Sequence, residues 1–363
     1  MTRTLSISLV TLGDPLTMTG GYLYHRRMAE LAPAYDARLT FASFPSLAFP
    51  LPALAARRVL RTVREQRPDV VLIDSICAAF LAPVRLPPGL PVAAILHQPP
   101  GGIDHGRPRA LAQAVLDRRT YRRAARLLVA SEPLGTELAR QGFGDRLVVV
   151  APGRDVPAPP PGPGADLRAG AGAALLCVAN WLPRKGVLDL LDAVAALPDG
   201  TARLHLAGDE DADPAYAARV RRRLGEPDLA GRVVRHGRLP KEEIARLYRD
   251  ADVFVLPSLR EPYGTVYGEA MAAGLPVVGW RAGNLPHLAR DGRDGLIVEP
   301  GDLPALTATL ARLCADSALR DRLGASARRR AEEFPTWEDS AALFFGTLRG
   351  LTPGGPAGPP LPR

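Results

Sequence analysis

Residues 260–269 read Arg260-Glu261-Pro262-Tyr263-Gly264-Thr265-Val266-Tyr267-Gly268-Glu269. An apolar, β-branched run (253–256) precedes this stretch and predicts a buried parallel strand. Turn residues continue as far as Gly264, and the pattern is then helical up to Gly274, which stands where a C-cap glycine belongs. A second apolar run (275–280) follows at once. The stretch therefore predicts one strand–loop–helix–strand unit.

The loop of this unit predicts an anion site with two acids beside it. A helix that starts at Thr265 presents free backbone N–H groups, and such helix N-termini attract phosphate. Glu261 lies in the loop and Glu269 about one turn into the helix, so both can face one ligand. A nucleotide sugar suits both features, because its diphosphate takes the N–H groups while its hydroxyls donate to carboxylates. On spacing alone, a surface acid and a helix N-terminal acid are an equally good interpretation.

The residues around the two acids carry a family resemblance. Seven residues separate the acids, and Pro-Tyr-Gly directly follows the first. The stretch resembles the signature of the retaining glycosyltransferases of family 4, which have the GT-B fold. The resemblance implies that Glu261 contacts the donor sugar and Glu269 the ribose. It also implies that the intervening loop and helix start line the donor site, through Tyr263, Gly264, Thr265 and Val266.

Length and composition predict two soluble domains in a reducing compartment. The chain has 363 residues, 47% of them hydrophobic, and a mean hydropathy of −0.01. Three distant cysteines (Cys77, Cys177 and Cys314) lie in apolar runs, which is typical of buried thiols and not of disulfides. No run approaches the ~20 apolar residues of a membrane span, and no signal peptide pattern begins the chain. We expect a cytoplasmic protein.

The net charge of +8 comes almost wholly from arginine, and much of it lies on two segments that are expected to be helical. One segment is 57–67 and the other is 118–126. Arginines spaced three and four apart share a helix face, for which a solvated surface is the simplest interpretation. Peripheral docking to the anionic inner membrane surface, or steering of an anionic acceptor, is the alternative. Nucleic acid is not expected, because no aromatic residues interleave.

In the first 150 residues, strands alternate with helical segments, which predicts a doubly wound parallel sheet. Gly20-Gly21 follow the first strand and resemble the family's glycine loop near the donor phosphates and the acceptor. An ordinary connection between strand and helix explains them equally well. His97 ends the strand 92–96 and resembles the family histidine that bonds to the donor sugar, although a lone histidine is more often structural.

A second phosphate cradle is predicted where strand 174–179 runs through a loop into helix 187–197. Arg184 and Lys185 stand at the start of that helix, and both side chains bind phosphate. By resemblance, Lys185-Gly186 match the family's Lys-Gly pair. Asn180 stands where the family has an arginine, and Arg184 is the candidate replacement. Leu239 belongs to a stretch that resembles the wall of the family's base pocket.

The resemblance implies an α/β protein with the GT-B fold, in which two Rossmann-like doubly wound domains face each other across a cleft. We expect an acceptor-side domain over 1–155, a Pro/Gly-rich linker over 156–172 and a nucleotide-sugar-binding domain over 173–333. A helix over 334–350 is expected to return to the first domain, and 351–363 to form a disordered tail.

The expected reaction is transfer of a glycosyl group, with retention, from a nucleotide-diphosphate sugar to an unidentified acceptor. The expected strands are not followed by an Asp-x-Asp motif that could hold Mg²⁺, so catalysis is expected to need neither metal nor cofactor. Arg184, Lys185 and the N–H groups after Gly264 would stabilise the leaving diphosphate. Two alternatives stay open. One is an enzyme of this type that couples a pseudo-sugar, and the other is a non-catalytic basic protein that binds nucleic acid or membrane.

Overall fold

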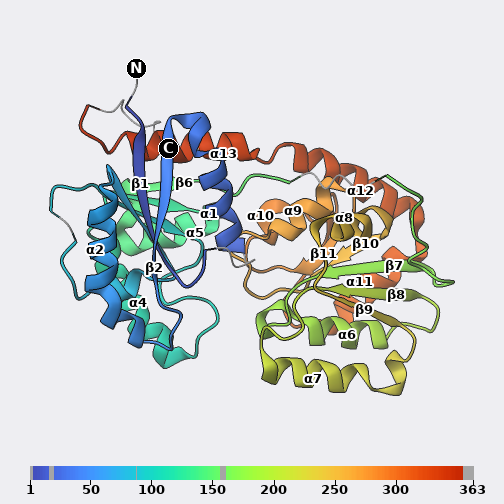
Figure 1. Cartoon of the computed structure of the whole chain (residues 1–363). Helices are drawn as coiled ribbons and strands as arrows, with labels where there is room; N and C mark the ends of the chain where they lie inside the picture. Colours follow the sequence, from blue (N-terminus) through green and yellow to red (C-terminus); the bar gives the residue numbers. More distant parts are fainter. Residues whose placement is uncertain (1–2, 16–19, 87, 156–160, 355–363) are drawn as a thin grey trace. The chain divides into compact units, whose positions relative to one another are not determined.

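A computed structural model describes residues 3–15, 20–86, 88–155 and 161–354. The chain divides into two compact units, coloured along the sequence in Figure 1. Unit 1 contains Met1–Gly153 and Pro335–Arg363, and unit 2 contains Arg154–Phe334. Each unit has its own sheet and its own hydrophobic core, so each is described separately.

Unit 1 is built on a six-stranded parallel sheet with the order β2-β1-β3-β4-β5-β6. Its central strands are near-continuous apolar runs, because helices cover both faces of a parallel sheet. Every residue of β3 and β4 is buried. The strands are β1 (Leu5–Leu12), β2 (Ala37–Phe44), β3 (Val70–Asp74), β4 (Val92–Leu96), β5 (Arg126–Val129) and β6 (Leu147–Val149).

The helices of unit 1 lie in two layers, one on each face of the sheet. One apolar cluster joins the sheet to α2, α3, α4 and α5, and another joins it to α1 and α13. The helices are α1 (Gly20–Leu31), α2 (Ala56–Gln66), α3 (Ala78–Leu81), α4 (Arg107–Tyr121), α5 (Glu132–Leu138) and α13 (Trp337–Arg349). Short 3₁₀ turns cover Ala32–Tyr35, Leu51–Ala55 and Gly144–Arg146, and a π turn covers Ala139–Phe143.

The last helix, α13, is part of the core of unit 1. It begins with a capping box, in which Thr336 and Asp339 satisfy each other's backbone N–H groups. Its buried face includes Phe344 and Phe345, which pack in the same cluster as β1 and β3. The hydroxyl of Ser340 donates to the carbonyl oxygen of Ala151 at 2.7 Å. The end of the chain thus completes a layer that the first 150 residues leave open.

Unit 2 repeats the plan with a parallel sheet of the order β12-β11-β10-β7-β8-β9. Its strands are β7 (Ala173–Val178), β8 (Ala202–Ala207), β9 (Val233–Gly237), β10 (Val253–Val255), β11 (Val277–Trp280) and β12 (Gly295–Val298). Its helices are α6 (Val187–Ala195), α7 (Pro214–Leu224), α8 (Lys241–Asp250), α9 (Thr265–Ala272), α10 (Leu285–Leu288), α11 (Leu303–Ala315) and α12 (Ser317–Glu332). Further 3₁₀ turns cover Pro183–Lys185 and Pro227–Leu229. Two doubly wound Rossmann-like units are thereby confirmed.

The structure differs from the sequence expectations at several element boundaries. Of the arginine-rich segments expected to be helical, 57–67 lies in α2 up to Gln66, whereas only the first four residues of 118–126 belong to α4, and Arg126 already opens β5. The strand expected from 275 begins at Val277, after Pro276. Helices α7, α11 and α12 were missed. These three helices pack on the core of unit 2, and each buries apolar residues in it.

Parts of two expected segments lie outside the described residues. Of the expected linker, 156–160 are not described, and 161–172 form neither helix nor strand. Of the expected tail, 355–363 are not described, whereas Leu351 packs against the core of unit 1.

Two helical glycines give a matched test of the packing. A Cβ on Gly324 in α12 would lie 2.1 Å from the carbonyl oxygen of Gly274, whereas a Cβ on Gly346 in α13 would meet nothing within 4 Å. Gly324→Ala should therefore lower the free energy of unfolding by about 1–3 kcal/mol. Gly346→Ala should raise it by up to about 1 kcal/mol, through helix propensity. Chemical denaturation measures both, and equal effects would contradict the close approach of α12.

Candidate functional site

The central site of unit 2 is placed by the pairing of β7 with β10. Leu175 pairs with Val253 and Leu176 with Phe254 in a parallel register. The loops that follow these two strands, 180–186 and 257–264, therefore leave the same edge of the sheet. The strand order switches between β7 and β10: the chain runs from β7 outward to β8 and β9, then returns to β10 on the other side of β7. Ligands of doubly wound sheets bind beyond the strand ends at such a point.

Backbone contacts join the two loops. The carbonyl oxygen of Arg184 accepts hydrogen bonds from the backbone N–H of Leu259 (2.8 Å) and from the hydroxyl of Ser258 (3.1 Å). Gly186 has φ +69°, and a Cβ there would lie 2.1 Å from the carbonyl oxygen of Pro257. Glycine is thus required both for the left-handed turn and for the close approach.

Three charged side chains that were predicted to act on the donor meet where these loops touch. The ammonium of Lys185 donates to Oε2 of Glu261. A guanidinium nitrogen of Arg184 lies 3.8 Å from the same oxygen and donates to the carbonyl oxygen of Arg260 at 2.9 Å. Only 12–16% of each of the three side chains is exposed. The loops therefore hold two cations and one acid together, partly shielded from water.

Helix α9 starts beside this cluster. Gly264 has φ +87° and is the N-cap of the helix. The first hydrogen bond of the helix runs from the backbone N–H of Tyr267 to the carbonyl oxygen of Gly264 at 3.0 Å. The N–H groups of Thr265 and Val266 come before that bond, so they are the donors that a helix N-terminus offers to an anion. Burial raises the pKa of Tyr263 to about 12, so its hydroxyl stays protonated.

Asn284, which was not among the residues predicted from the sequence, fixes this loop. Its side-chain amide donates to the carbonyl oxygen of Tyr263 at 2.7 Å, and its backbone N–H donates to the carbonyl oxygen of Glu261 at 2.9 Å. The adjoining Gly283 passes so close that a Cβ would lie 2.6 Å from the backbone nitrogen of Glu261. The sequence signal for Asn284 was the pair Gly283-Asn284, because it follows β11, the strand next to β10 in the sheet.

Glu269 faces a buried tyrosine. The hydroxyl of Tyr248 in α8 donates to Oε2 of Glu269 at 3.0 Å. Burial raises the pKa of Glu269 to about 7, partly offset by this hydrogen bond and by Lys241, whereas Asp155 adds to the rise. Near neutral pH the carboxyl group is therefore partly protonated and partly ionised. Tyr248 was not predicted, because a tyrosine inside an amphipathic helix has no local sequence signal.

Asn180 and Leu239, which were also predicted to bind the donor, contact residues outside the cluster of Arg184, Lys185 and Glu261. Oδ1 of Asn180 accepts from the backbone N–H of Asp209 at 3.0 Å, so this side chain ties the loop after β7 to the loop after β8. Leu239 lines a hollow on unit 2 together with Leu167, His236 and Leu247.

The predicted residues of unit 1 lie at the strand ends of its own sheet. Gly20 and Gly21 form the first turn of α1, and a Cβ on Gly21 would lie 3.6 Å from the imidazole of His97. Nε2 of His97 is buried and has no hydrogen-bond partner among the described residues. Burial, followed by the neighbouring His25, lowers the pKa of His97 to about 3. His97 is therefore neutral and keeps one ring nitrogen available.

His25, for which the sequence suggested no role, is the neighbour of His97. The two rings lie 5.0 Å apart, edge to face. Nε2 of His25 bonds to the buried Asp74 at 2.8 Å, and the hydroxyl of Thr11 donates to the same oxygen at 2.9 Å. Asp74 and His97 end neighbouring strands, β3 and β4, and so come together only in the folded sheet.

One premise of the metal-free expectation needs correction. An Asp-x-Asp run does follow a strand, since Asp209 and Asp211 come after β8 with only Gly208 between the strand and the run. In the structure Arg238 pairs with Asp209 at 2.6 Å, and Arg221 pairs with Asp211 at 2.5 Å. Over the described ranges, no group of three His, Cys, Asp or Glu side chains is placed to hold a metal ion.

Both units match family descriptions of one enzyme class. Residues 5–153 match the "Glycosyl transferase 4-like domain" and residues 172–316 match "Glycosyl transferases group 1". The chain belongs to the group 1 glycosyltransferases. The resemblance carried by the two acids and the Lys-Gly pair is thus confirmed at the level of the family. The roles of the individual residues stay predictions.

Two curated relatives illustrate the similarity of this group 1 chain to proteins with assigned activities. It is 36% identical over 259 residues to a D-inositol 3-phosphate glycosyltransferase of Streptomyces bingchenggensis, covering 65% of this chain and 55% of the relative. It is 36% identical over 163 residues to the MMP alpha-(1->4)-mannosyltransferase of Mycolicibacterium hassiacum, covering 44% of this chain and 39% of that protein. The chain thus spans about half the length of the curated relatives it matches.

Solved structures establish the fold. Sucrose-phosphate synthase of Thermosynechococcus elongatus matches with a TM-score of 0.79 at 21% identity, over 94% of this chain and 97% of that one. Anabaena Alr3699/HepE, solved with UDP-glucose, matches with a TM-score of 0.78 at 21% identity, over 94% and 99%. The group 1 chain therefore has the GT-B fold. None of the helices in its described part is long and apolar enough to cross a membrane.

The raised pKa of Glu269 predicts a stability cost that depends on pH. An acid whose folded pKa lies above its unfolded value of about 4.3 destabilises the fold progressively as pH rises between the two values. Glu269→Gln removes the charge and can still accept from Tyr248. It should raise the free energy of unfolding by about 1–3 kcal/mol at about pH 8, and by clearly less at about pH 5. Denaturant titrations at both pH values measure this, and an equal gain at both would exclude the charge as the cause.

Proposed function

We propose that this chain is a retaining, metal-independent glycosyltransferase that moves a sugar from a nucleotide-diphosphate donor to an acceptor hydroxyl. The acceptor class is a cell-envelope glycan or lipid, or a small natural product. Unit 2 would bind the donor, and unit 1 the acceptor. Family membership supports the reaction class. The arrangement of Arg184, Lys185 and Glu261 beside the start of α9 supports the donor.

The observation that carries the proposal is the ion pair between Lys185 and Glu261. A partly buried pair of this kind keeps both side chains in defined rotamers and limits the reorganisation that a ligand must cause. A bound diphosphate would take Lys185, Arg184 and the N–H groups of Thr265 and Val266. Glu261 would then be left to accept hydrogen bonds from sugar hydroxyls.

The chemistry follows from these charges. As the bond from the anomeric carbon to the phosphate oxygen breaks, the electron pair leaves with the diphosphate, where Lys185 and Arg184 stabilise it. The acceptor hydroxyl attacks the same face of the sugar and passes its proton to the departing phosphate oxygen. His97, neutral and with a buried free nitrogen, can hydrogen-bond a sugar hydroxyl without adding charge. No covalent intermediate on the protein is required.

We further propose that the enzyme works in the cytoplasm, at the anionic inner face of a membrane. The arginine-rich helices of unit 1 support this location through their charge.

Donor binding gives the first test of the function. Thermal shift with a panel of UDP-, GDP-, ADP- and TDP-sugars should raise the melting temperature for one base and one sugar, because a ligand that binds only the folded state stabilises it. Slow hydrolysis of that donor should accompany binding. The non-catalytic alternative predicts neither shift nor hydrolysis.

The two acids should separate nucleotide binding from sugar transfer. Glu269→Ala should weaken binding of the free nucleoside diphosphate, because the ribose loses its carboxylate. Glu261→Ala should leave that affinity unchanged or tighter, because Lys185 loses its competing partner, while turnover of the full donor falls. Calorimetry with the nucleotide and a transfer assay measure the two effects. Equal losses of nucleotide affinity would void the assignment.

Because Asn180 stands where the family has an arginine, turnover is expected to depend on Arg184. Removing a preorganised stabiliser of developing charge costs about 10²–10³ in turnover. If Arg184 replaces the family arginine, Arg184→Ala should be nearly as damaging as Lys185→Ala, and Asn180→Arg should restore part of the loss. Arg222→Ala, on the exposed side of α7, is the matched control. A silent Arg184→Ala beside a damaging Lys185→Ala would favour the pseudo-sugar alternative.

Metal independence and stereochemistry are tested together. Activity should survive EDTA, because cations of the protein neutralise the leaving group. An α-linked donor should give an α-linked product by NMR. Loss of activity in EDTA that Mg²⁺ restores would refute metal independence, and a β-linked product would refute retention.

A further inference from the structure

Exposed large apolar side chains gather on one side of unit 1. Six such residues occur in the described part of the chain, and five of them belong to two segments of this unit. Leu47, Leu51 and Leu54 lie before and within the 3₁₀ turn ahead of α2, and Leu111 and Val115 lie on α4. Leu54 is 85% exposed and Leu111 is 71% exposed. Exposed apolar residues that gather on one face of a protein mark interaction sites.

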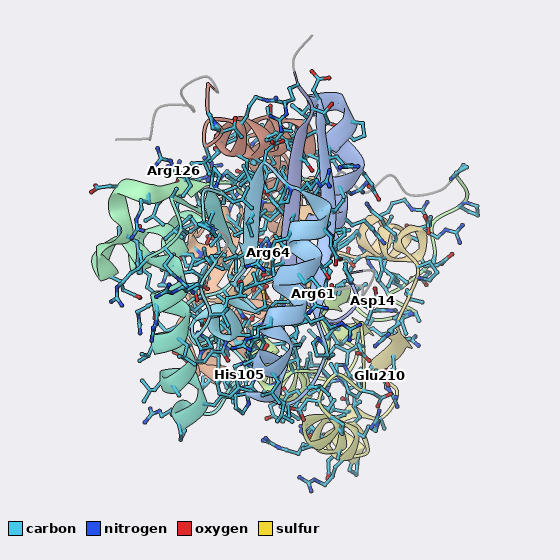
Figure 2. All side chains as sticks on the ribbon, turned by 60° about the vertical axis from the view of Figure 1, so that its left-hand side comes forward. Asp14, Arg61, Arg64, His105, Arg126 and Glu210 are labelled. Atoms are coloured by element: carbon cyan, nitrogen blue, oxygen red, sulfur yellow. The ribbon has the colours of Figure 1, made fainter. Side chains whose placement is uncertain are left out.

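The two segments share one face of the unit. Helices α2 and α4 pack through the same apolar cluster, on the face of the sheet opposite to α1 and α13. The guanidinium of Arg109 in α4 lies 5.3 Å above the ring of Phe49, next to the leucines. Figure 2 looks onto this side: Arg61 and Arg64 lie along α2, while His105 precedes α4 and Arg126 opens β5 beyond the end of that helix.

The same segments carry the positive charge of the protein. Residues 45–67 and 107–126 contain twelve arginines and two acids, a net +10, so the rest of the chain, which carries +8 in total, has a net charge of −2. One of the two acids, Asp117, is buried, which leaves Glu65 as the exposed one. On α2 the arginines at 57, 58, 61 and 64 are exposed, whereas Val59, Leu60 and Val63 pack inward.

The chemistry of this surface selects its partner. Aliphatic side chains surrounded by arginines match the boundary between acyl chains and anionic headgroups. They do not suit single-stranded nucleic acid, because bases stack on aromatic rings and not on leucine. They do not suit a second copy of the chain either, since two such faces would bring like charges together.

From these observations we infer that unit 1 docks on an anionic phospholipid bilayer through the Leu–Arg surface. This surface consists of Leu47, Leu51, Leu54, Leu111, Val115 and the exposed arginines of α2 and α4. The leucines and the valine would enter the headgroup boundary, and the arginines would pair with lipid phosphates. The inference rests on the membrane contact proposed above but not on the transfer reaction, and it replaces the simpler interpretation of a solvated helix face.

Vesicle binding of the whole chain, without donor or acceptor, tests the inference. The protein should float with vesicles of phosphatidylcholine and phosphatidylglycerol, bind weakly to phosphatidylcholine alone, and be released by salt. This measurement needs no substitution. Equal binding to both vesicle types, or to neither, would overturn the inference.

Two double variants locate the surface. Leu54→Glu with Leu111→Glu removes apolar contact, and Arg58→Glu with Arg61→Glu reverses charge. Each should weaken binding to anionic vesicles by about tenfold or more. The matched controls are in unit 2: Leu259→Glu, at the sixth exposed apolar residue, and Arg219→Glu with Arg222→Glu on α7.

Several outcomes would contradict the assignment. Equal losses in the control variants would mean that total charge, and not this surface, drives binding. A dimer in size-exclusion chromatography that Leu54→Glu with Leu111→Glu dissolves would make the surface a subunit interface. Tight binding of single-stranded RNA that the same variant abolishes would assign the surface to nucleic acid. A failed donor panel would refute the proposed transferase and leave the vesicle result unaffected.

Discussion

The parallel pairing of β7 with β10 is the constraint on which the site of unit 2 depends. It places the ends of two strands, about 75 residues apart in the chain, at adjacent positions on one edge of the sheet. Lys185 and Glu261 leave from those two ends and form an ion pair. The loops reach each other because Gly186 allows the carbonyl group of Pro257 to approach. Without the strand pairing, the charges of this site would have no common location.

Unit 1 uses the same constraint for a different set of groups. The pairing of β3 with β4 places Asp74 near His97. Helix α1 adds His25, which bonds to Asp74 and packs edge to face against the ring of His97. The carboxylate of Asp74 accepts hydrogen bonds where burial would otherwise make a charge costly. His97 in turn stays neutral beside the paired His25. The two units thus have the same architecture but different charges at their strand ends. Unit 2 holds two cations and an acid there, whereas unit 1 holds a neutral imidazole.

Glu269 has a stability cost that its proposed role in donor binding would explain. A carboxyl group held under protein with a raised pKa costs stability above neutral pH, and Tyr248 recovers only part of that cost through one hydrogen bond. In the proposed donor site, this carboxyl group would serve as a hydrogen-bond acceptor that is already oriented and poorly solvated. The cluster of Arg184, Lys185 and Glu261 would serve the same proposed site with two cations and one acid.

The sequence by itself determined the strand–loop–helix alternation, the two-domain α/β architecture and the family, because turn glycines, apolar runs and the two spaced acids are local signals. It also brought Lys185 and Glu261 to attention, each in its own loop. Only the tertiary structure decided that these two side chains bond to each other, that Tyr248 and Asn284 support the acids, and that His25 and Asp74 flank His97. It alone showed the exposed leucines among the arginines. The physical reason is that strand order and helix packing set which distant residues meet and which stay in water, and no short stretch of sequence carries that information.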